Sequence, residues 1–281
     1  MDLVSAFFSV CVNINSDMLM TSGKISVALF MVEGKLIEDK KNKDCEDFIT
    51  FVKTKLMLRF NPFNRIHKGL RALLYHSSLS LQRTDFSNEH QIKNILEKLT
   101  ELIELFEQHA QTEEQHTLSM LKKIAPNIVA DFKKLHTQDR QLGEELKTAI
   151  ASVKEAKAKE ARLKAAFQLQ ITLTEFAAFH LLHMNREETV LNEKLWQHFG
   201  DEEIMAVMVK LQASVPPDQM VKYAYWMLKG LSMNEIIEWY KDIKVTQSSS
   251  VFENHKQIAQ LALSESEYET LYDALKEKAV A

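Results

Sequence analysis

From residue 62 onward, apolar residues recur every three to four positions, which is the period of an amphipathic helix. The first such stripe contains Ile66, Leu70, Leu73, Leu74 and Leu81. The pattern continues through four long segments, with expected bounds of about 63–83, 89–121, 126–150 and 154–195. Long helices joined by short connections predict an antiparallel up-down-up-down four-helix bundle.

The pattern changes on both sides of this region. After Gly200 it predicts five shorter helices, at about 201–213, 217–229, 232–241, 251–261 and 265–279. Residues 1–56 lack the helical period, and residues 25–37 favour a β-hairpin. We therefore expect three parts. Residues 1–56 are an N-terminal extension, either an overlong start or a genuine small appendage. Residues 57–200 are the bundle, and residues 201–281 are a helical C-terminal cap or small domain.

Composition supports an all-α fold class. The 281 residues include only 6 glycines and 4 prolines, and 46% are apolar, so a sizeable helical core can be buried. The formal net charge of −4 gives no electrostatic reason to expect nucleic-acid binding.

The cysteine content suggests a reducing compartment. Cys11 and Cys45 cannot build a disulfide framework, a zinc knuckle or a redox motif. The apolar start of the chain lacks the features of a secretory signal, and no uncharged apolar run of about 18 residues predicts a membrane span. These observations predict a soluble, cytoplasmic protein.

One short motif occurs twice, as HAQTEE at residues 109–114 and HMNREE at residues 183–188. Residues four apart share a helix face, so His109 lies with Glu113 and His183 with Glu187. Bulky apolar neighbours turn these faces inward, where a glutamate is costly unless it is paired or bound to metal. Imidazole and carboxylate ligands together suit non-haem iron or manganese. The pattern predicts a metal site between two helices.

The other two long helices offer further histidines. His67 lies on the apolar stripe of the first helix, whereas His76 lies on the opposite face, so we select His67. The third helix has one histidine, His136, next to Leu135. Each of the four helices therefore contributes one inward histidine.

The order of these residues resembles the hemerythrin-like family, also called the histidine-histidine-glutamate cation-binding domain. The resemblance covers about residues 62–195. It implies a four-helix bundle with two iron ions, bridged by Glu113 and Glu187. It also implies that the four histidines are terminal ligands. The metal-ligand set is then His67, His109, Glu113, His136, His183 and Glu187.

One position departs from the oxygen carriers of that family, which have a second histidine four residues after the first on the third helix. Arg140 stands there instead. One iron would then carry water, another carboxylate or an open position, which puts reversible oxygen carriage in doubt. His180 and His116 are the candidates for a substitute ligand, and the charge of Arg140 could steady a bound anion.

Simpler interpretations apply to other residues. We expect Glu114 and Glu188 to be exposed to solvent, because each lies about 100° round the helix from the preceding glutamate. His90, His198 and His255 are expected at the surface. Two pairs that contain aromatic residues are expected in the core and not in a ligand pocket, Trp226-Met227 and Trp239-Tyr240.

The sequence therefore predicts a di-iron protein that binds O2 or a related small oxidant, NO or peroxide, for sensing, scavenging or iron handling. It leaves open whether an oxidase or peroxide-consuming activity follows. The main alternative is an iron- or oxygen-responsive interaction module, whose metal is mainly structural and whose C-terminal helices contact a protein partner. A metal-free scaffold would leave the buried Glu113 and Glu187 unexplained.

Overall fold

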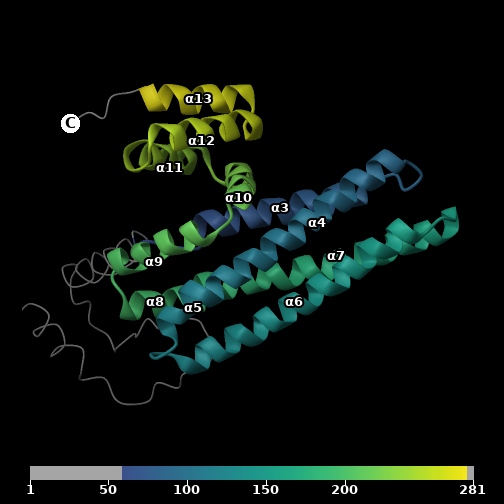
Figure 1. Ribbon diagram of the computed structural model, residues 1–281, viewed down its shortest axis with the longest axis horizontal. Coiled ribbons are helices and arrows are strands. Elements are labelled where there is room, and N and C mark those ends of the chain that lie inside the picture. Colours follow the sequence, from purple (N-terminus) through teal and green to yellow (C-terminus); the bar gives the residue numbers. More distant parts are fainter. Residues whose placement is uncertain (1–58, 277–281) are drawn as a thin grey trace, which may run out of the picture. The chain divides into compact units, whose positions relative to one another are not determined.

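The computed structural model describes residues 59–276, and within that range the chain is helical and has no strand (Figure 1). The expected all-α fold class is confirmed for this part of the chain. The predicted extension, residues 1–56, and the hairpin expected at 25–37 lie outside the described residues.

Four long helices carry most of the structure, as the apolar stripes predict. They are α3 (Asn64–Gln82), α4 (Glu89–Thr112), α6 (Pro126–Glu155) and α7 (Lys159–Arg186). Helix α3 packs against α4 and α7, and α6 packs against the same two helices. A shared core fills the space between them, with side chains such as Leu99, Leu102 and Phe176 almost fully buried.

Local sequence explains most helix ends. The Asn88 side chain accepts hydrogen bonds from the backbone N–H groups of His90 and Gln91 and so caps α4. Pro126 occupies the first turn of α6, where its missing N–H costs nothing. The predicted start of the fourth helix at residue 154 is wrong, because α6 continues through Glu155 and the chain leaves the helix at Ala156, whose backbone is extended.

The second and fourth long segments are not continuous α-helices. Each contains one π-helical turn, η1 (Glu113–Thr117) and η2 (Glu187–Leu191). Each then returns to α-helix, as α5 (Leu118–Leu121) and α8 (Asn192–His198). Short π-helical segments are rare and occur often at functional sites. Both begin at the glutamate of a His-x-x-x-Glu motif.

Five shorter helices follow, close to the expected bounds. They are α9 (Asp201–Ser214), α10 (Pro217–Gly230), α11 (Met233–Thr246), α12 (Ser249–Ala262) and α13 (Glu265–Lys276). Trp239 and Tyr240 lie in an apolar core formed by α10 to α13. The expectation that these aromatic residues are core residues is confirmed.

Helix α10 packs closely along α3 (Figure 1). Its Tyr223 and Trp226 belong to the same core as the four long helices. A Cβ atom on Gly230 would lie 2.2 Å from the carbonyl oxygen of Lys68, and one on Gly69 would lie 2.8 Å from the backbone nitrogen of Met227. Only glycine fits at these two points, and on α3 they involve Lys68 and Gly69, which directly follow His67 in the sequence.

None of the helices between residues 59 and 276 combines the length and apolar character needed to cross a bilayer.

Candidate metal centre

All six residues predicted as metal ligands come together between the four long helices. His67 projects from α3, His109 from α4, His136 from α6 and His183 from α7. Glu113 and Glu187 open the π-helical turns that follow α4 and α7. Residues that are up to 120 positions apart in the chain therefore share one site.

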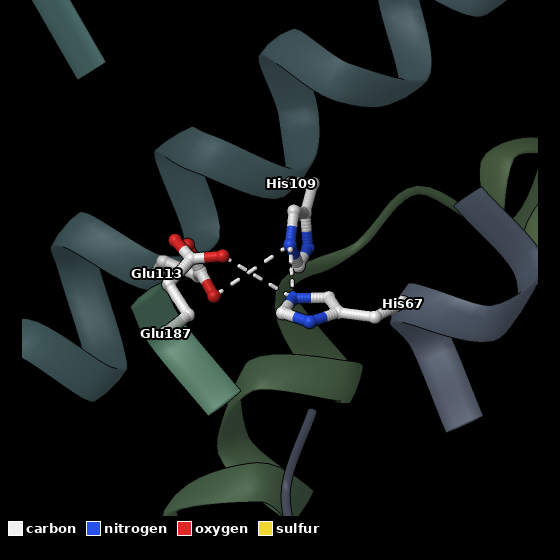
Figure 2. A group of neighbouring side chains, drawn as sticks. All are labelled: His67, His109, Glu113 and Glu187. Atoms are coloured by element: carbon white, nitrogen blue, oxygen red, sulfur yellow. Dashed lines mark hydrogen bonds and ion pairs between the residues drawn. The ribbon is translucent and has the colours of Figure 1, made fainter. Parts of the chain in front are cut away.

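The six side chains form two overlapping groups, and both glutamates belong to each group. One group adds His67 and His109, and the other adds His136 and His183. Within each group, one nitrogen or oxygen of every residue lies within 4.8 Å of those of the others. Figure 2 shows the first group, in which His67 and His109 approach from separate helices toward the two carboxylates.

Every histidine turns its Nε2 atom toward the carboxylates. The Glu187 carboxylate lies 3.3 Å from His67 Nε2, 3.7 Å from His136 Nε2 and 2.6 Å from His183 Nε2. The Glu113 carboxylate lies 3.6 Å from His109 Nε2 and 3.5 Å from His136 Nε2. Each carboxylate thus reaches histidines of both groups, as a bridging ligand must.

The site is buried, yet several of its polar atoms lack hydrogen-bond partners. His67, His136 and Glu187 are completely inaccessible to solvent, and Glu113 is nearly so. Both carboxylate oxygens of Glu113 and Glu187 and the Nε2 atom of His136 make no hydrogen bond. Even the 2.6 Å approach of His183 Nε2 to Glu187 does not have hydrogen-bond geometry. Buried polar atoms are nearly always satisfied, so this cluster requires another partner.

Without a bound cation, the ionisable side chains of this cluster do not balance one another's charges. Burial, together with the neighbouring Glu187, raises the pKa of Glu113 well above its usual range. Burial also lowers the pKa of His109 to about 3, with the neighbouring His67 adding to the shift. His136 is pushed the other way: burial opposes its charge, but the two carboxylates raise its pKa to about 10. Two adjacent buried carboxylates repel each other unless a cation or a proton lies between them.

These residues fit a divalent metal ion. The Nε2 atoms of His67 and His109 are 3.2 Å apart. Two imidazole nitrogens bound to one ion at about 2.0–2.1 Å lie roughly 2.8–3.4 Å apart when the ligand angle is about 90–110°. Four imidazoles and two carboxylates form a ligand set suited to iron, manganese or zinc.

A second ring of side chains surrounds the six. The Nδ1 atom of His67 donates to Oε1 of Glu188 at 2.9 Å. Arg71 donates to the same oxygen at 2.7 Å and to the side-chain oxygen of Asn185 at 3.0 Å. Burial opposes ionisation of Glu188, but the hydrogen bonds from His67 and Arg71 lower its pKa to about 2.

The same arrangement recurs around His136. Its Nδ1 atom donates to Oε1 of Glu114 at 3.1 Å, and Arg140 donates to that oxygen at 3.1 Å. Arg140 also donates to the Thr137 hydroxyl at 3.2 Å. Its guanidinium therefore contacts this outer glutamate, and the prediction that its charge could steady an anion near the site stays a prediction.

The prediction that Glu114 and Glu188 are exposed to solvent is wrong. Their side chains are only 28% and 27% exposed, and both bind a histidine. Our expectation assumed the rotation of an α-helix, but the wider π-helical turn rotates less per residue. The sequence did carry a signal, because the glutamate is doubled in both motifs, and an arginine follows both His67 and His136 by four residues.

Neither histidine proposed as a substitute ligand joins the centre. His180 is buried, but its Nε2 atom lies 2.7 Å from Asp139 and its Nδ1 atom lies 2.8 Å from the carbonyl oxygen of Phe176. It is a hydrogen-bonded core residue. His116 contacts the Ser214 hydroxyl at 3.2 Å.

The three histidines expected at the surface differ. His90 and His198 are exposed, as predicted. His255 is not, because it packs against the rings of Trp239 and Tyr240, and burial lowers its pKa.

Comparison with known proteins assigns the central part of the chain. Residues 61–195 match the family model described as the hemerythrin HHE cation binding domain.

Three of the similar curated proteins are each named F-box/LRR-repeat protein 5. The protein from Salmo salar is 28% identical over 171 residues, which are 61% of this chain and 24% of that protein. The one from Mus musculus is 25% identical over 206 residues, 71% of this chain and 29% of that protein. The one from Bos taurus is 29% identical over 171 residues, 61% of this chain and 24% of that protein. The chain spans about a quarter of the length of these relatives. No solved structure matched the chain.

Proposed function

Because residues 61–195 belong to the hemerythrin HHE cation-binding family, we propose that this chain is a non-haem di-iron protein that binds O2 or a related small oxidant, NO or peroxide. Sensing, scavenging and iron handling are the roles that such binding would serve.

One observation carries the two-metal part of this proposal: Glu113 and Glu187 each lie near histidines of both groups. A carboxylate can bridge two ions with its two oxygens, as in other two-metal sites, where the ions lie about 3.5–4 Å apart. His67 and His109 would then hold one ion, and His136 and His183 the other. The unpartnered oxygens of both glutamates would be satisfied by the ions.

Iron is favoured because its two oxidation states allow a reduced pair of ions to supply electrons to a small oxidant. The residues of the chain would hold the ions and limit the access of water. Phe63 stacks on the His67 ring with centroids 5.2 Å apart. Phe132 and Phe179 lie 5.9 and 5.7 Å from the His183 ring. Apolar walls of this kind exclude water and strengthen electrostatic interactions inside the site.

The antiparallel four-helix bundle of this family is part of the proposal. Paired contacts support it: on α3 and α4, His67 meets His109 and His76 meets Lys98, so the residue numbers rise on one helix as they fall on the other. The pairs Glu107–Lys147 and Glu114–His136 support the same relation between α4 and α6. The division of the chain after residue 200 and its cytoplasmic location also stay predictions.

A second function is favoured by the packing of α10. This helix lies against the backbone of α3 beside His67. The relatives carry F-box and LRR-repeat in their name, and this chain matches only a quarter of them. The alternative is therefore an interaction module in which metal binding sets the stability of the bundle, and α10 to α13 contact a protein partner.

The decisive experiment has two steps. The chain is purified from iron-replete cells without oxygen, and its metals are measured by mass spectrometry; we expect about two iron ions per chain. The reduced protein is then mixed with oxygenated buffer in a stopped-flow instrument, and a change in absorbance is expected. The same chain stripped by a chelator is the control.

The outcomes separate the two functions. Bound iron with an oxygen-dependent spectrum supports the main proposal. Bound iron without any spectral change, combined with metal-dependent protection of α10 to α13 from proteolysis, supports the interaction module. A chain that binds no iron contradicts both.

A further inference from the structure

The outer glutamates follow a pattern that metal ligation alone does not explain. Helices α3 and α4, joined by residues 83–88, form the first helical hairpin. Helices α6 and α7 form the second. Glu188, which follows α7, binds His67 of the first hairpin. Glu114, which follows α4, binds His136 of the second hairpin. Each hairpin thus holds a histidine of the other.

The chemistry of a carboxylate gives the direction of each hydrogen bond. An ionised carboxylate only accepts, so the Nδ1 atoms of His67 and His136 must carry the proton and donate it. Each Nε2 atom is then directed at the centre, where it lies 3.3 Å and 3.5 Å from the carboxylates of Glu187 and Glu113. An imidazole fixed in this way has the orientation that a metal ligand needs before any metal arrives.

The arginines complete each unit. Removing the charge of a carboxylate from water costs free energy unless a nearby cation compensates that charge. Arg71 supplies that charge to Glu188 at 2.7 Å, and Arg140 supplies it to Glu114 at 3.1 Å. Each arginine lies on the same helix as the histidine of its unit, one turn further along. The result is two His–Glu–Arg units with the same internal contacts.

We infer that Glu188 and Glu114 are positioning residues, which aim His67 and His136 at the centre and tie the two hairpins together around it. This inference rests on the proposed metal function for its consequence, but the hydrogen bonds can be tested without any metal. It also gives a reason for the second glutamate of each motif, since the first faces the metal and the second faces a histidine of the other hairpin.

The first test measures the hydrogen bonds in the metal-free chain. Nitrogen-15 NMR of histidine side chains follows exchange of the Nδ1 protons with solvent. We expect slow exchange at His67 and His136 in the natural chain. Glu188→Ala should speed exchange at His67 alone, and Glu114→Ala at His136 alone. Glu175→Ala, an exposed glutamate on α7, is the matched control and should change neither.

The second test measures the consequence with Co2+ as the probe, titrated against a competing chelator. Loss of an outer partner of a metal-bound histidine typically lowers affinity about 10–100-fold, so we expect this range for Glu188→Ala and Glu114→Ala. Glu188→Gln and Glu114→Gln keep an oxygen acceptor and should recover most of the affinity. A role in folding alone would not produce that recovery. Circular dichroism checks that each variant is folded, and the Gln variants serve if an Ala variant is not.

Each result decides something. Weaker Co2+ binding together with faster exchange at the matching histidine supports the inference. Unchanged exchange in the Ala variants overturns it, whatever the metal data are. Faster exchange with Co2+ affinity within about 2-fold of the natural chain overturns the role in metal binding. If the natural chain binds no Co2+, the proposed metal function is contradicted. The exchange data still decide whether the two glutamates hold the histidines.

Discussion

Helices α3 and α6 each contribute one histidine to the centre and, four residues later, one arginine to its outer ring. Their hydrogen bonds are nearly the same, but their surroundings are not. Arg71 on α3 is 20% exposed and binds two residues near the end of α7, whereas Arg140 on α6 is 54% exposed and binds one residue outside its own helix. Helix α3 is also covered by α10, with glycines at the points of contact.

The repeated motif gives both sides the same hydrogen bonds. The helices packed around each side determine how rigidly those residues are held. The His67 side is clamped from outside by α10, and by α11 through the contact of Glu235 with Lys68 and Asn64. The main neighbours of α6 are α7 and α4, which already belong to the bundle. We therefore expect the His136 side to tolerate change better.

The largest effect should come from the carboxylates that both sides share. Glu187 lies near three histidines and Glu113 near two, so they should not be equivalent. Both are proposed bridges, so either change removes a ligand from each ion, but Glu187→Ala should lose both ions because its carboxylate approaches three of the four histidines. Glu113→Ala should lose most of one. Metal content by mass spectrometry decides this, and full iron occupancy in Glu113→Ala would contradict the assignment of Glu113 as a bridge.

The next effect concerns the contact between α3 and α10. Gly230→Ala puts a methyl group onto the backbone of Lys68, so we expect a loss of about 1–3 kcal/mol in the free energy of unfolding. Gly143→Ala on α6 is the matched change. Its nearest neighbour would be the flexible end of Glu107 at 3.3 Å, and alanine favours helix by up to about 1 kcal/mol. Gly143→Ala should be neutral or stabilising in thermal unfolding.

Equal losses from Gly230→Ala and Gly143→Ala would remove the distinction between the two sides. A further comparison uses Gly69→Ala, whose methyl group would meet the backbone of Met227 from the opposite direction. It should resemble Gly230→Ala, since both changes push α3 and α10 apart.

A smaller effect is expected from the two arginines. Arg71→Gln should weaken Co2+ binding about tenfold, because a partly buried arginine with two partners supports Glu188. Arg140→Gln should change it by less than about threefold, because exposed ion pairs contribute little. The titration with a competing chelator measures both. A larger effect at Arg140 would reverse our ranking of the two sides.

The smallest effect concerns pH and the contact of α11 with α3. Burial opposes the charge of Glu235, but hydrogen bonds from Lys68, Ser232 and Asn64 lower its pKa to about 2. A lowered folded-state pKa means that the stabilisation is present above the ordinary value of 4.5 and is lost as pH falls toward 2. Glu235→Gln should therefore flatten the acid limb of a stability profile. Denaturant unfolding of both chains from pH 6 to pH 3 measures the difference, and parallel profiles would show that this contact does not contribute.

The sequence alone determined the main helices and which six residues meet at the candidate centre. The apolar stripes set where α3, α4, α6 and α7 run, because a period of 3.6 residues is a local property of the chain. The His-x-x-x-Glu spacing set which face His109, Glu113, His183 and Glu187 occupy. The position of His67 on its stripe, and of His136 beside one, selected the other two predicted ligands. Each of these inferences needs only the rotation of one helix.

Tertiary structure decided what lies beyond one helix. The partners of Glu114 and Glu188 sit on another hairpin, and the π-helical turns that aim these glutamates are a departure from regular rotation. His180 lies only about 60° round α7 from His183, yet packing pairs it with Asp139 on α6 and keeps it out of the centre. The two glycines that admit α10 to α3 are 161 positions apart. Periodicity describes a single helix, whereas these contacts depend on which helices meet and in which register.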